Sequence, residues 1–287
     1  MAKYAGVSVA TVSYVLGNHP GIKIRPETRD RVQEAARVLN YRPSYIVTAL
    51  TTRCSCNICV LFKSLHHLNY RFYREILIGA GSAMEEENYH LLLFFRSSGL
   101  RFVESMRAGR ADGMFVIQSD EENQPIVELA ENRIPMVIVN RPAPEIDPEM
   151  AAVVMPDHYA MMRESIENFI RHGKKKLMLV NLDTCTNHIM NSAFFEICSK
   201  HASEQVIGSF LMRPERPDFE KYLRQMIADG NAPEAMFINR FEYAESACRV
   251  FAEEGKIPGK DILIASCDPD VLPSSFPYAM TLYVHDG

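Results

Sequence analysis

The stretch that decides the fold lies at the start of the chain, where residues 2–16 read Ala-Lys-Tyr-Ala-Gly-Val-Ser-Val-Ala-Thr-Val-Ser-Tyr-Val-Leu. Ser8 belongs to the residue types that cap helix N-termini, and Val12, Val15 and Leu16 follow at the spacing of a helix with one apolar face. The glycine before Ser8 predicts a tight turn, and the residues before that glycine predict the end of an earlier helix. The pattern therefore predicts two short helices joined by a turn, the helix-turn-helix arrangement.

A third helix is predicted over residues 26–39, because proline is favoured in the first turn of a helix. Its apolar stripe consists of Val32, Ala35, Ala36 and Leu39. These three helices would bury one small core within residues 1–42. The first interpretation of this segment is a DNA-binding domain, and the alternative is an ordinary helical cap with a solvated charged face.

The outer face of the second helix carries the chemistry that favours DNA. Small or hydroxyl-bearing residues near a helix N-terminus let that end enter a major groove. We expect Val9, Ala10 and Tyr14 to meet base edges there. Thr11 and Ser13 are expected to donate hydrogen bonds to phosphates.

Charge is distributed unevenly along the 287 residues, although the net charge is only −5. Residues 1–53 hold eight Lys or Arg against three Asp or Glu, which gives this segment +5 and leaves −10 for the remainder. A basic head on an acidic body favours contact between the head and a polyanion. No apolar run approaches the length of a membrane span, and no secretory signal is evident at the N-terminus, so we expect a cytoplasmic protein.

Residues 43–53 are predicted to be a hinge segment. The β-branched Ile46, Val47 and Thr48 make this stretch a poor helix on its own, so it should order only against a surface. A plain linker is the alternative interpretation.

Residues 54–287 show apolar runs that alternate with amphipathic helical stretches, which predicts an α/β body with parallel sheets and helices on both faces. We expect a first lobe over about residues 54–141 and a second over about 150–278, with an effector site at the carboxyl ends of the strands. The predicted strands of the first lobe are 58–62, 90–95, 113–117 and 136–139, and those of the second are 153–155, 176–181, 205–210, 235–238 and 262–266.

The sequence resembles the lactose-repressor (LacI/GalR-type) family of bacterial transcription regulators. The resemblance is strongest over residues 1–16, and it continues through Glu27–Val32, Leu39–Pro43 and several body motifs such as Ile257–Ile262. It implies a dimeric DNA-binding regulator, most often a repressor, with a two-lobed periplasmic-binding-protein-like body that binds a small-molecule effector. Pseudo-palindromic double-stranded operator DNA would be the partner.

The resemblance also assigns roles in the head and the hinge. It implies that Val9, Ala10 and Tyr14 read bases, and that the DNA backbone is held by Ser8, Thr11, Ser13, Thr28 and Tyr41. It matches Leu50 to the leucine that wedges into a minor-groove base step. At the cap of the third helix this chain has Arg25, where the family often has serine.

For the effector, the resemblance points to Phe72 and Tyr73, an aromatic pair that stacks on a ligand, and to Asp268, a hydrogen-bond acceptor. A core aromatic pair and a turn-forming aspartate are the structural alternatives. Asn140 replaces the family's aspartate after the fourth strand, and Met190 or Asn191 stands where a ligand-gripping arginine is expected. Arg240-Phe241 replaces an Asn-Asp pair. These departures make a purely sugar-like effector doubtful and favour a more apolar or atypical ligand, or none.

Relatives begin earlier than Met1 and continue beyond Gly287, so the resemblance implies a chain shortened at both ends. We therefore expect a clipped first helix and a body whose C-terminal part is missing, with an uncovered edge strand. A degenerate small-molecule-binding protein that has lost DNA binding is the alternative function.

Cys54, Cys56 and Cys59 suggest a metal or redox role, but their spacing is not that of a paired Cys-x-x-Cys site. The alternative is three small apolar residues at the entrance of a strand. Gly79 and Gly81 resemble part of a nucleotide-binding loop, yet they fall inside a predicted helix. No nucleophile, metal or phosphate-loop motif occurs, so the sequence predicts neither an enzyme nor a bound cofactor or metal.

Overall fold

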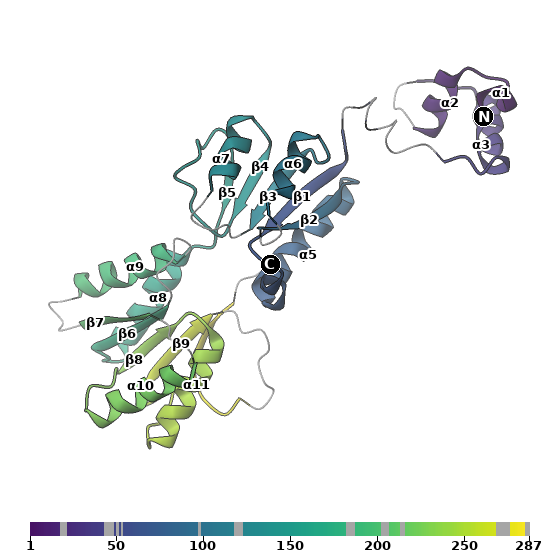
Figure 1. Ribbon diagram of the computed structural model, residues 1–287. Helices are drawn as coiled ribbons and strands as arrows, with labels where there is room; N and C mark the ends of the chain where they lie inside the picture. Colours follow the sequence, from purple (N-terminus) through teal and green to yellow (C-terminus); the bar gives the residue numbers. More distant parts are fainter. Residues whose placement is uncertain are drawn as a thin grey trace. The chain divides into compact units, whose positions relative to one another are not determined.

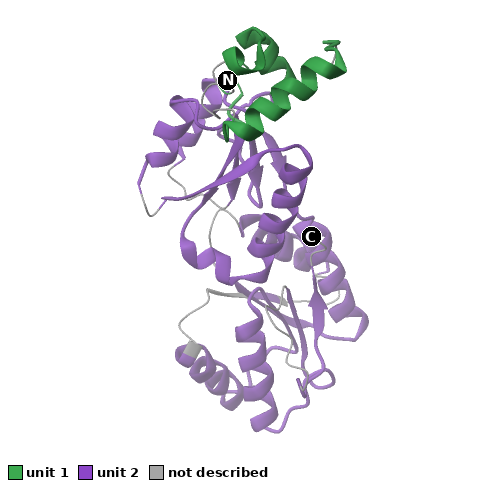
Figure 2. Ribbon diagram, turned by 90° about the vertical axis from the view of Figure 1, so that its right-hand side faces the viewer, with its two compact units in different colours: residues 1–56 green, residues 57–287 purple. Residues whose placement is uncertain are grey.

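The computed structural model describes the whole chain except residues 18–21, 43–48, 50–51, 53, 97–98, 118–122, 182–186, 202–206, 213–215, 268–275 and 285–287. The chain divides into two compact units, a head over Met1–Cys56 and a body over Asn57–Gly287 (Figure 2). Each unit has its own hydrophobic core.

The head contains three helices, α1 (Ala2–Ala5), α2 (Val9–Leu16) and α3 (Pro26–Val38) (Figure 1). Gly6 ends α1 at φ 66°, a left-handed conformation that glycine adopts without the steric cost of a side chain. The predicted helix-turn-helix is confirmed. Its core consists of Ala5, Val12, Val15, Val32 and Ala35.

The predicted stripe of α3 is wrong at its end. Leu39 lies just beyond the last helical residue and is 44% exposed, so it does not join the head core. The backbone turns there, with Asn40 at φ 44°, and this turn carries the Leu39 side chain off the stripe.

The first sheet of the body is parallel, with strand order β2-β1-β3-β4-β5 among the described residues. Its strands are β1 (Asn57–Phe62), β2 (His90–Phe95), β3 (Gly113–Ile117), β4 (Met136–Val139) and β5 (Ala152–Val154). Its helices are the 3-10 turn η1 (Leu65–Asn69), α5 (Arg71–Glu86), α6 (Arg101–Arg107) and α7 (Gln124–Glu131).

Successive side chains of these strands point to opposite faces, and different helices cover each face. Cys59 and Leu61 of β1 pack in one core cluster with residues of α6 and α7. Val60 and Phe62 pack on the other face with Tyr73 of α5. Helices on both faces explain why β1 is an almost uninterrupted apolar run.

The second sheet is also parallel and has the order β10-β9-β8-β6-β7. Its strands are β6 (Lys176–Asn181), β7 (Ile207–Met212), β8 (Ala235–Ile238), β9 (Leu263–Cys267) and β10 (Thr281–Tyr283). One face is covered by α8 (His158–Arg171) and α9 (His188–Lys200), and the other by α10 (Arg216–Ala228) and α11 (Phe241–Glu253). The predicted fold class is confirmed.

Three strand predictions need correction. The strand predicted at 153–155 was assigned to the second lobe, but β5 pairs with β4 and forms the edge of the first sheet. All three residues of β5 are exposed, so no burial pattern marked the sheet to which they belong. Strands β7 and β9 begin two residues and one residue later than predicted, and β10 was not predicted.

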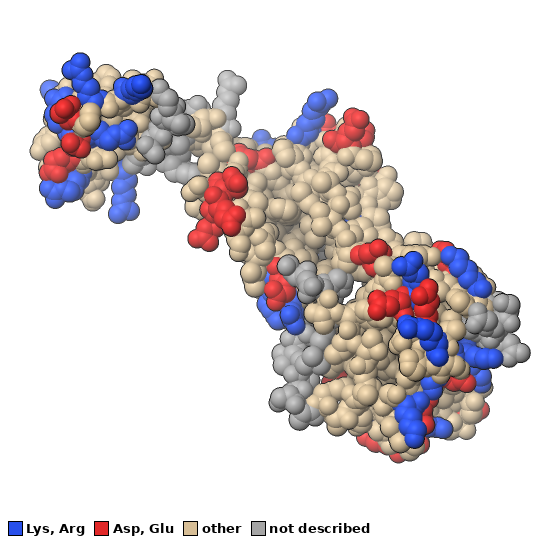
Figure 3. Space-filling model, turned by 180° about the vertical axis from the view of Figure 1, so that it is seen from behind, with Lys and Arg blue, Asp and Glu red and all other residues tan. Residues whose placement is uncertain are grey.

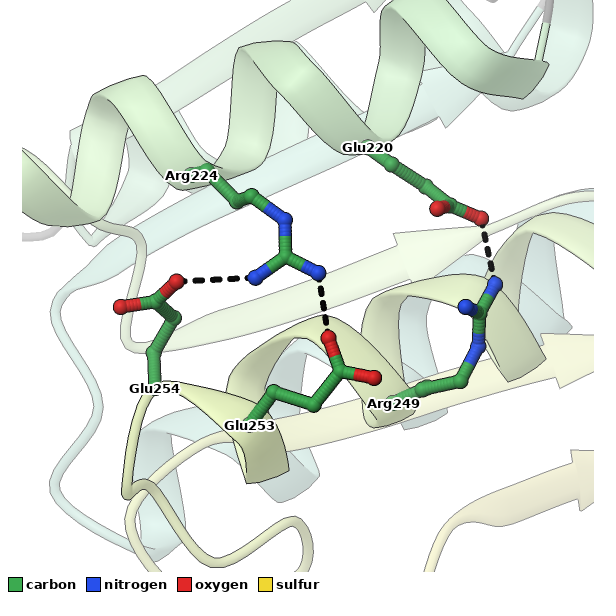
Figure 4. A network of polar contacts seen from close by, with 5 residues as sticks. All are labelled: Glu220, Arg224, Arg249, Glu253 and Glu254. Carbon is green, nitrogen blue, oxygen red and sulfur yellow. Dashed lines mark hydrogen bonds and ion pairs between the residues drawn. The ribbon is translucent and has the colours of Figure 1, made fainter.

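A network of ion pairs joins the outer surfaces of α10 and α11. Arg224 reaches both Glu253 and Glu254, and Arg249 binds Glu220 (Figure 4). No helix in the described part of the chain is long and apolar enough to cross a membrane.

Candidate nucleic-acid interface and effector site

The outer face of α2 is an exposed surface made of small, apolar and hydroxyl side chains. Val9 is 76% exposed and Tyr14 is 40% exposed, and Ala10 and Ser13 lie on the same open side. The neighbouring Val12 and Val15 are buried against α3 and α1. The helix therefore separates a buried packing face from an exposed face, and the exposed face holds the three residues predicted to read bases.

The N-terminus of α2 is closed by a side-chain cap. The Oγ of Ser8 accepts a hydrogen bond from the backbone N–H of Thr11 at 3.1 Å, and the Ser8 and Thr11 hydroxyls lie 2.9 Å apart. A serine cap satisfies a helix-end N–H group that would otherwise lack an intrahelical partner. Ser8 and Thr11 thus fix the N-terminus of α2, which is the end of the helix predicted to enter the major groove. The Ser8 side chain is exposed there.

The other predicted backbone contacts lie on two further parts of the head. Thr28 is half-buried in the first turn of α3, and Tyr41 is exposed just beyond that helix. Arg25, the residue that departs from the family pattern, precedes Pro26 and makes no side-chain cap.

Cationic side chains gather on the head, with few acidic ones between them (Figure 3). Arg37 forms a two-point ion pair with Glu34 on the exposed side of α3, at 2.7 and 2.9 Å. This pair raises the pKa of Arg37 above its ordinary value, so the side chain stays cationic. Such a surface suits a polyanion.

Two predicted residues fall outside the described part of the chain. They are Leu50, the expected minor-groove wedge, and Asp268, the expected effector acceptor. The predicted hinge over residues 43–53 is also largely outside it.

In the first lobe, aromatic side chains gather after the carboxyl end of β1. The ring of Tyr73 lies 5.1 Å from that of His67, 5.2 Å from that of Phe72 and 6.4 Å from that of Tyr70, in edge-on arrangements. Both residues lie in the first turn of α5, where Tyr73 is buried in the core and Phe72 is half-buried. The two predicted aromatic residues therefore lie together, with Tyr73 packed as a core residue.

In the second lobe, a chain of amide side chains lies at the carboxyl ends of the strands. Asn239, directly after β8, donates from Nδ2 to Oδ1 of Asn181, the last residue of β6, at 2.7 Å. Asn181 in turn donates to Oδ1 of Asn191 in α9 at 2.9 Å. Asn239 also lies 3.3 Å from Oδ1 of Asn187, and Cys267 donates its S–H to Asn239. The predicted Asn191 thus belongs to a cluster of polar groups.

Arg240 connects the two lobes. Its guanidinium carbon lies 3.9 Å from the centre of the Tyr70 ring, a cation–π geometry, and Glu242 binds its Nη2 at 2.5 Å. Burial by itself lowers the pKa of Arg240, but the hydrogen bonds with Glu242 and Tyr70 raise it above its ordinary value. Because Arg240 follows β8 and Tyr70 follows β1, this contact shows that the carboxyl ends of the two sheets approach each other.

The predicted Asn140 lies at the crossing from the first lobe to the second. It is buried with φ 60°, and its Oδ1 lies 3.3 Å from Nε2 of His158, the first residue of α8. Asn140 therefore holds the start of the second lobe against the end of β4, and it does not join the amide cluster in any contact described.

Asn181, Asn187 and Asn239 were not among the predicted site residues. A signal was present for two of them, because Asn181 and Asn239 each end an otherwise apolar run, Leu177–Val180 and Ala235–Ile238. A polar residue that ends a buried parallel strand lies at the edge where ligands bind. The carboxyl ends of the second sheet therefore hold more polar groups than the sequence departures from the family pattern had suggested.

Residues 1–56 thus form a helix-turn-helix head with an open outer face, and residues 57–287 form a two-lobed α/β body. The model of the family described as "Bacterial regulatory proteins, lacI family" matches residues 1–44. The head of the chain is therefore similar to the DNA-binding part of this family.

Curated relatives and solved structures are also similar to this chain. The probable HTH-type transcriptional repressor ExuR of Bacillus subtilis is 30% identical over 183 residues, which cover 63% of this chain and 53% of ExuR. Catabolite control protein A of Priestia megaterium is 21% identical over 93% of this chain and 81% of its own length. The match to ExuR therefore spans about half of that relative's length.

The body and head together have the fold of solved regulators. The lac repressor dimer bound to operator and the anti-inducer ONPF matches with a TM-score of 0.76 at 21% identity, over 97% of this chain and 84% of the repressor. A complex of the transcriptional regulator CelR with cellobiose matches with a TM-score of 0.62 at 19% identity, over 94% and 81% of the two chains.

Proposed function

We propose that this protein is a cytoplasmic, sequence-specific DNA-binding transcription regulator, of the repressor type, and not an enzyme. The observation that carries the proposal is the open outer face of α2, where Val9, Ala10 and Tyr14 are exposed while Val12 and Val15 hold the helix to the head core. A capped helix with such a face fits the major groove, and the +5 charge of residues 1–53 supplies attraction to phosphates. Two copies would read the two halves of a pseudo-palindromic operator.

A small-molecule effector would bind where the carboxyl ends of the two sheets approach. The groups available there are the amides of Asn181, Asn191 and Asn239, the guanidinium of Arg240 and the aromatic side chains around Tyr70. Amides both donate and accept hydrogen bonds, and aromatic rings pack on the apolar face of a ligand ring. This combination fits a small polar ring compound, such as a sugar or an acidic sugar derivative. An effector that favours one lobe arrangement would shift the population of DNA-binding molecules.

The test is a selection of DNA by the full-length chain. The protein would be incubated at low salt with duplexes of random sequence, and the bound fraction would be amplified and sequenced over several rounds. We expect an enriched motif with two-fold symmetry, and an affinity for it that falls steeply as salt rises. If no sequence is enriched over the input, although the head is folded by circular dichroism, the proposed function is wrong.

The effector site has a separate test. The melting temperature of the body would be measured with a panel of mono- and disaccharides, including cellobiose and glucose, and with their acidic derivatives. A ligand of this site should stabilise the wild-type body and have a weaker effect on Asn191→Leu. The control is Asn231→Leu, which changes an exposed amide before the start of β8, whereas Asn239 of the cluster follows the other end of that strand. Equal stabilisation of both variants would place the ligand elsewhere.

A further inference from the structure

A pair of cysteines lies where the head ends and the body begins. The sulfur atoms of Cys54 and Cys56 are 3.5 Å apart, and both residues are half-buried. Ser55, which lies between them, is buried. Strand β1 starts at Asn57, directly after Cys56. The two thiols thus point to the same side of a short segment that joins the two units of the chain.

The backbone of this segment explains why the two sulfur atoms meet. Cys56 has φ 47°, a left-handed conformation that few residue types other than glycine, asparagine and aspartate adopt readily. On the other side, Thr52 fixes Cys54, because its Oγ1 accepts the Cys54 N–H at 3.3 Å and also lies 3.4 Å from the Cys54 carbonyl oxygen. A strained backbone residue that persists in a fold often marks a site with a role beyond packing.

The deeper cysteines of the body lie in a different environment. Cys59 is fully buried in β1, and desolvation raises the pKa of its thiol to about 12. Cys248 and Cys198 are also buried, which raises their pKa values to about 12 and about 11. Because the thiolate is the reactive form, these three cysteines should resist mild oxidation, and Cys54 and Cys56 are more open to small reagents.

We infer that Cys54 and Cys56 form a reversible dithiol–disulfide site that responds to a small oxidant such as hydrogen peroxide. The thiolate of one cysteine attacks the peroxide, so that an S–O bond forms, the O–O bond breaks, and the departing hydroxide takes up a proton as water. The second thiolate then attacks this sulfur, the S–S bond forms, and a second hydroxide leaves as water. The two thiols lose two electrons and two protons, and one peroxide becomes two waters.

The geometry makes this bond both accessible and easily reversed. Formation of the bond would bring the sulfur atoms from 3.5 Å to about 2.05 Å, which is a short approach between two residues of one segment. A ring closed over a single intervening residue is strained, and strained disulfides have higher reduction potentials. Cellular dithiols would therefore reduce it readily.

The consequence for regulation rests on the proposed function. The ring would fix the backbone directly after residues 43–53, the segment that the sequence predicts to be a hinge. We expect the oxidised protein to bind its selected DNA about tenfold more weakly, which is the change that one strained residue in the bound state can cause.

The first experiment maps the bond. The full-length chain would be treated with a small excess of hydrogen peroxide, alkylated, digested and analysed by mass spectrometry, with and without later reduction by dithiothreitol. We expect an intramolecular Cys54–Cys56 disulfide that dithiothreitol removes, with Cys59 still reduced. Recovery of both cysteines as free thiols, or only as disulfides between chains, would overturn the inference.

The second experiment uses variants that cannot close the ring. Cys54→Ser keeps the size of the side chain, and Cys56→Asn introduces a residue type that tolerates positive φ, so both variants should fold. DNA selected by the reduced wild type would be titrated with each protein before and after peroxide. Loss of affinity on oxidation should occur in the wild type and in neither variant. If the disulfide forms and affinity does not change, the regulatory consequence is wrong; if the reduced protein selects no DNA, the proposed function fails while the map still decides the redox site.

Discussion

Replacement of Asn181 by leucine tests whether the amide cluster is a connected network. Asn181 is fully buried, donates to Asn191 and accepts from Asn239. Leucine has a similar volume but can neither donate nor accept a hydrogen bond. Oδ1 of the buried Asn191 and Nδ2 of the half-buried Asn239 would therefore each lose the hydrogen bond to residue 181. A buried polar group deprived of its partner costs about 1–3 kcal/mol, and the half-buried one costs less, so we expect a loss of ~2–4 kcal/mol in the free energy of unfolding of the body.

The assay is thermal and urea unfolding of the purified chain, followed by circular dichroism. For a unit of this size each kcal/mol lowers the melting temperature by about 2–4 °C, so the expected decrease is about 5–15 °C. The exposed control Asn231→Leu should stay within about 0.5 kcal/mol of the wild type.

A double variant makes the prediction sharper. In Asn181→Leu combined with Asn191→Leu, both ends of one hydrogen bond are apolar, and the combined loss should be smaller than the sum of the single losses by ~0.5–3 kcal/mol. Strict additivity, or an Asn181→Leu protein as stable as the control, would refute the account of the cluster.

Three further predictions concern single side chains. Ser8→Ala removes the cap that Thr11 donates to, and it should destabilise the head by ~1 kcal/mol in a thermal unfolding experiment. Glu234 accepts the backbone N–H groups of Lys175 and its neighbour, which lowers the pKa of the Glu234 carboxyl. Because the pKa of Glu234 is lower in the folded protein than in the unfolded chain, the ionised carboxylate stabilises the fold at pH values above the unfolded pKa. This stabilisation is lost as the pH falls through the folded pKa. Glu234→Gln should therefore be less stable than the wild type at pH 7, and the difference in urea midpoint should shrink below about pH 4. Arg224→Ala removes exposed ion pairs and should cost less than ~1 kcal/mol, which a urea titration at low and high salt can measure.

Most of the fold could be predicted because the residues follow simple periods. The alternation of Cys59 and Leu61 with Val60 and Phe62 between the two faces of β1 is the ordinary consequence of helices on both sides of a parallel sheet. In the head, the helical period separated Val12 and Val15 from the exposed residues of α2. The sheet that contains β5 could not be predicted, because three exposed residues carry no burial pattern.

The candidate sites were predictable only where one element supplies them. The outer face of α2 comes from one helix, and the sequence alone separated it from the core. The amide cluster comes from β6, the end of β8 and α9, so its membership depends on strand order. Cys54 and Cys56 meet where Cys56 has a positive φ angle, and neither hydrophobic periodicity nor residue spacing predicts that angle for a cysteine.

The most direct test of the central claim compares two neighbouring residues of α2. Tyr14 is exposed on the outer face and Val15 is buried in the head core, so Tyr14→Ala and Val15→Ala separate base recognition from folding. The DNA selection would be repeated with both variants and the wild type. The account predicts that Tyr14→Ala folds like the wild type and relaxes the base preference at one symmetric pair of positions, by about 1–3 kcal/mol for each position. Val15→Ala should lower head stability and keep the preference of its folded fraction. An unchanged base preference in Tyr14→Ala, Val9→Ser and Ala10→Ser alike would contradict the claim that this face reads DNA.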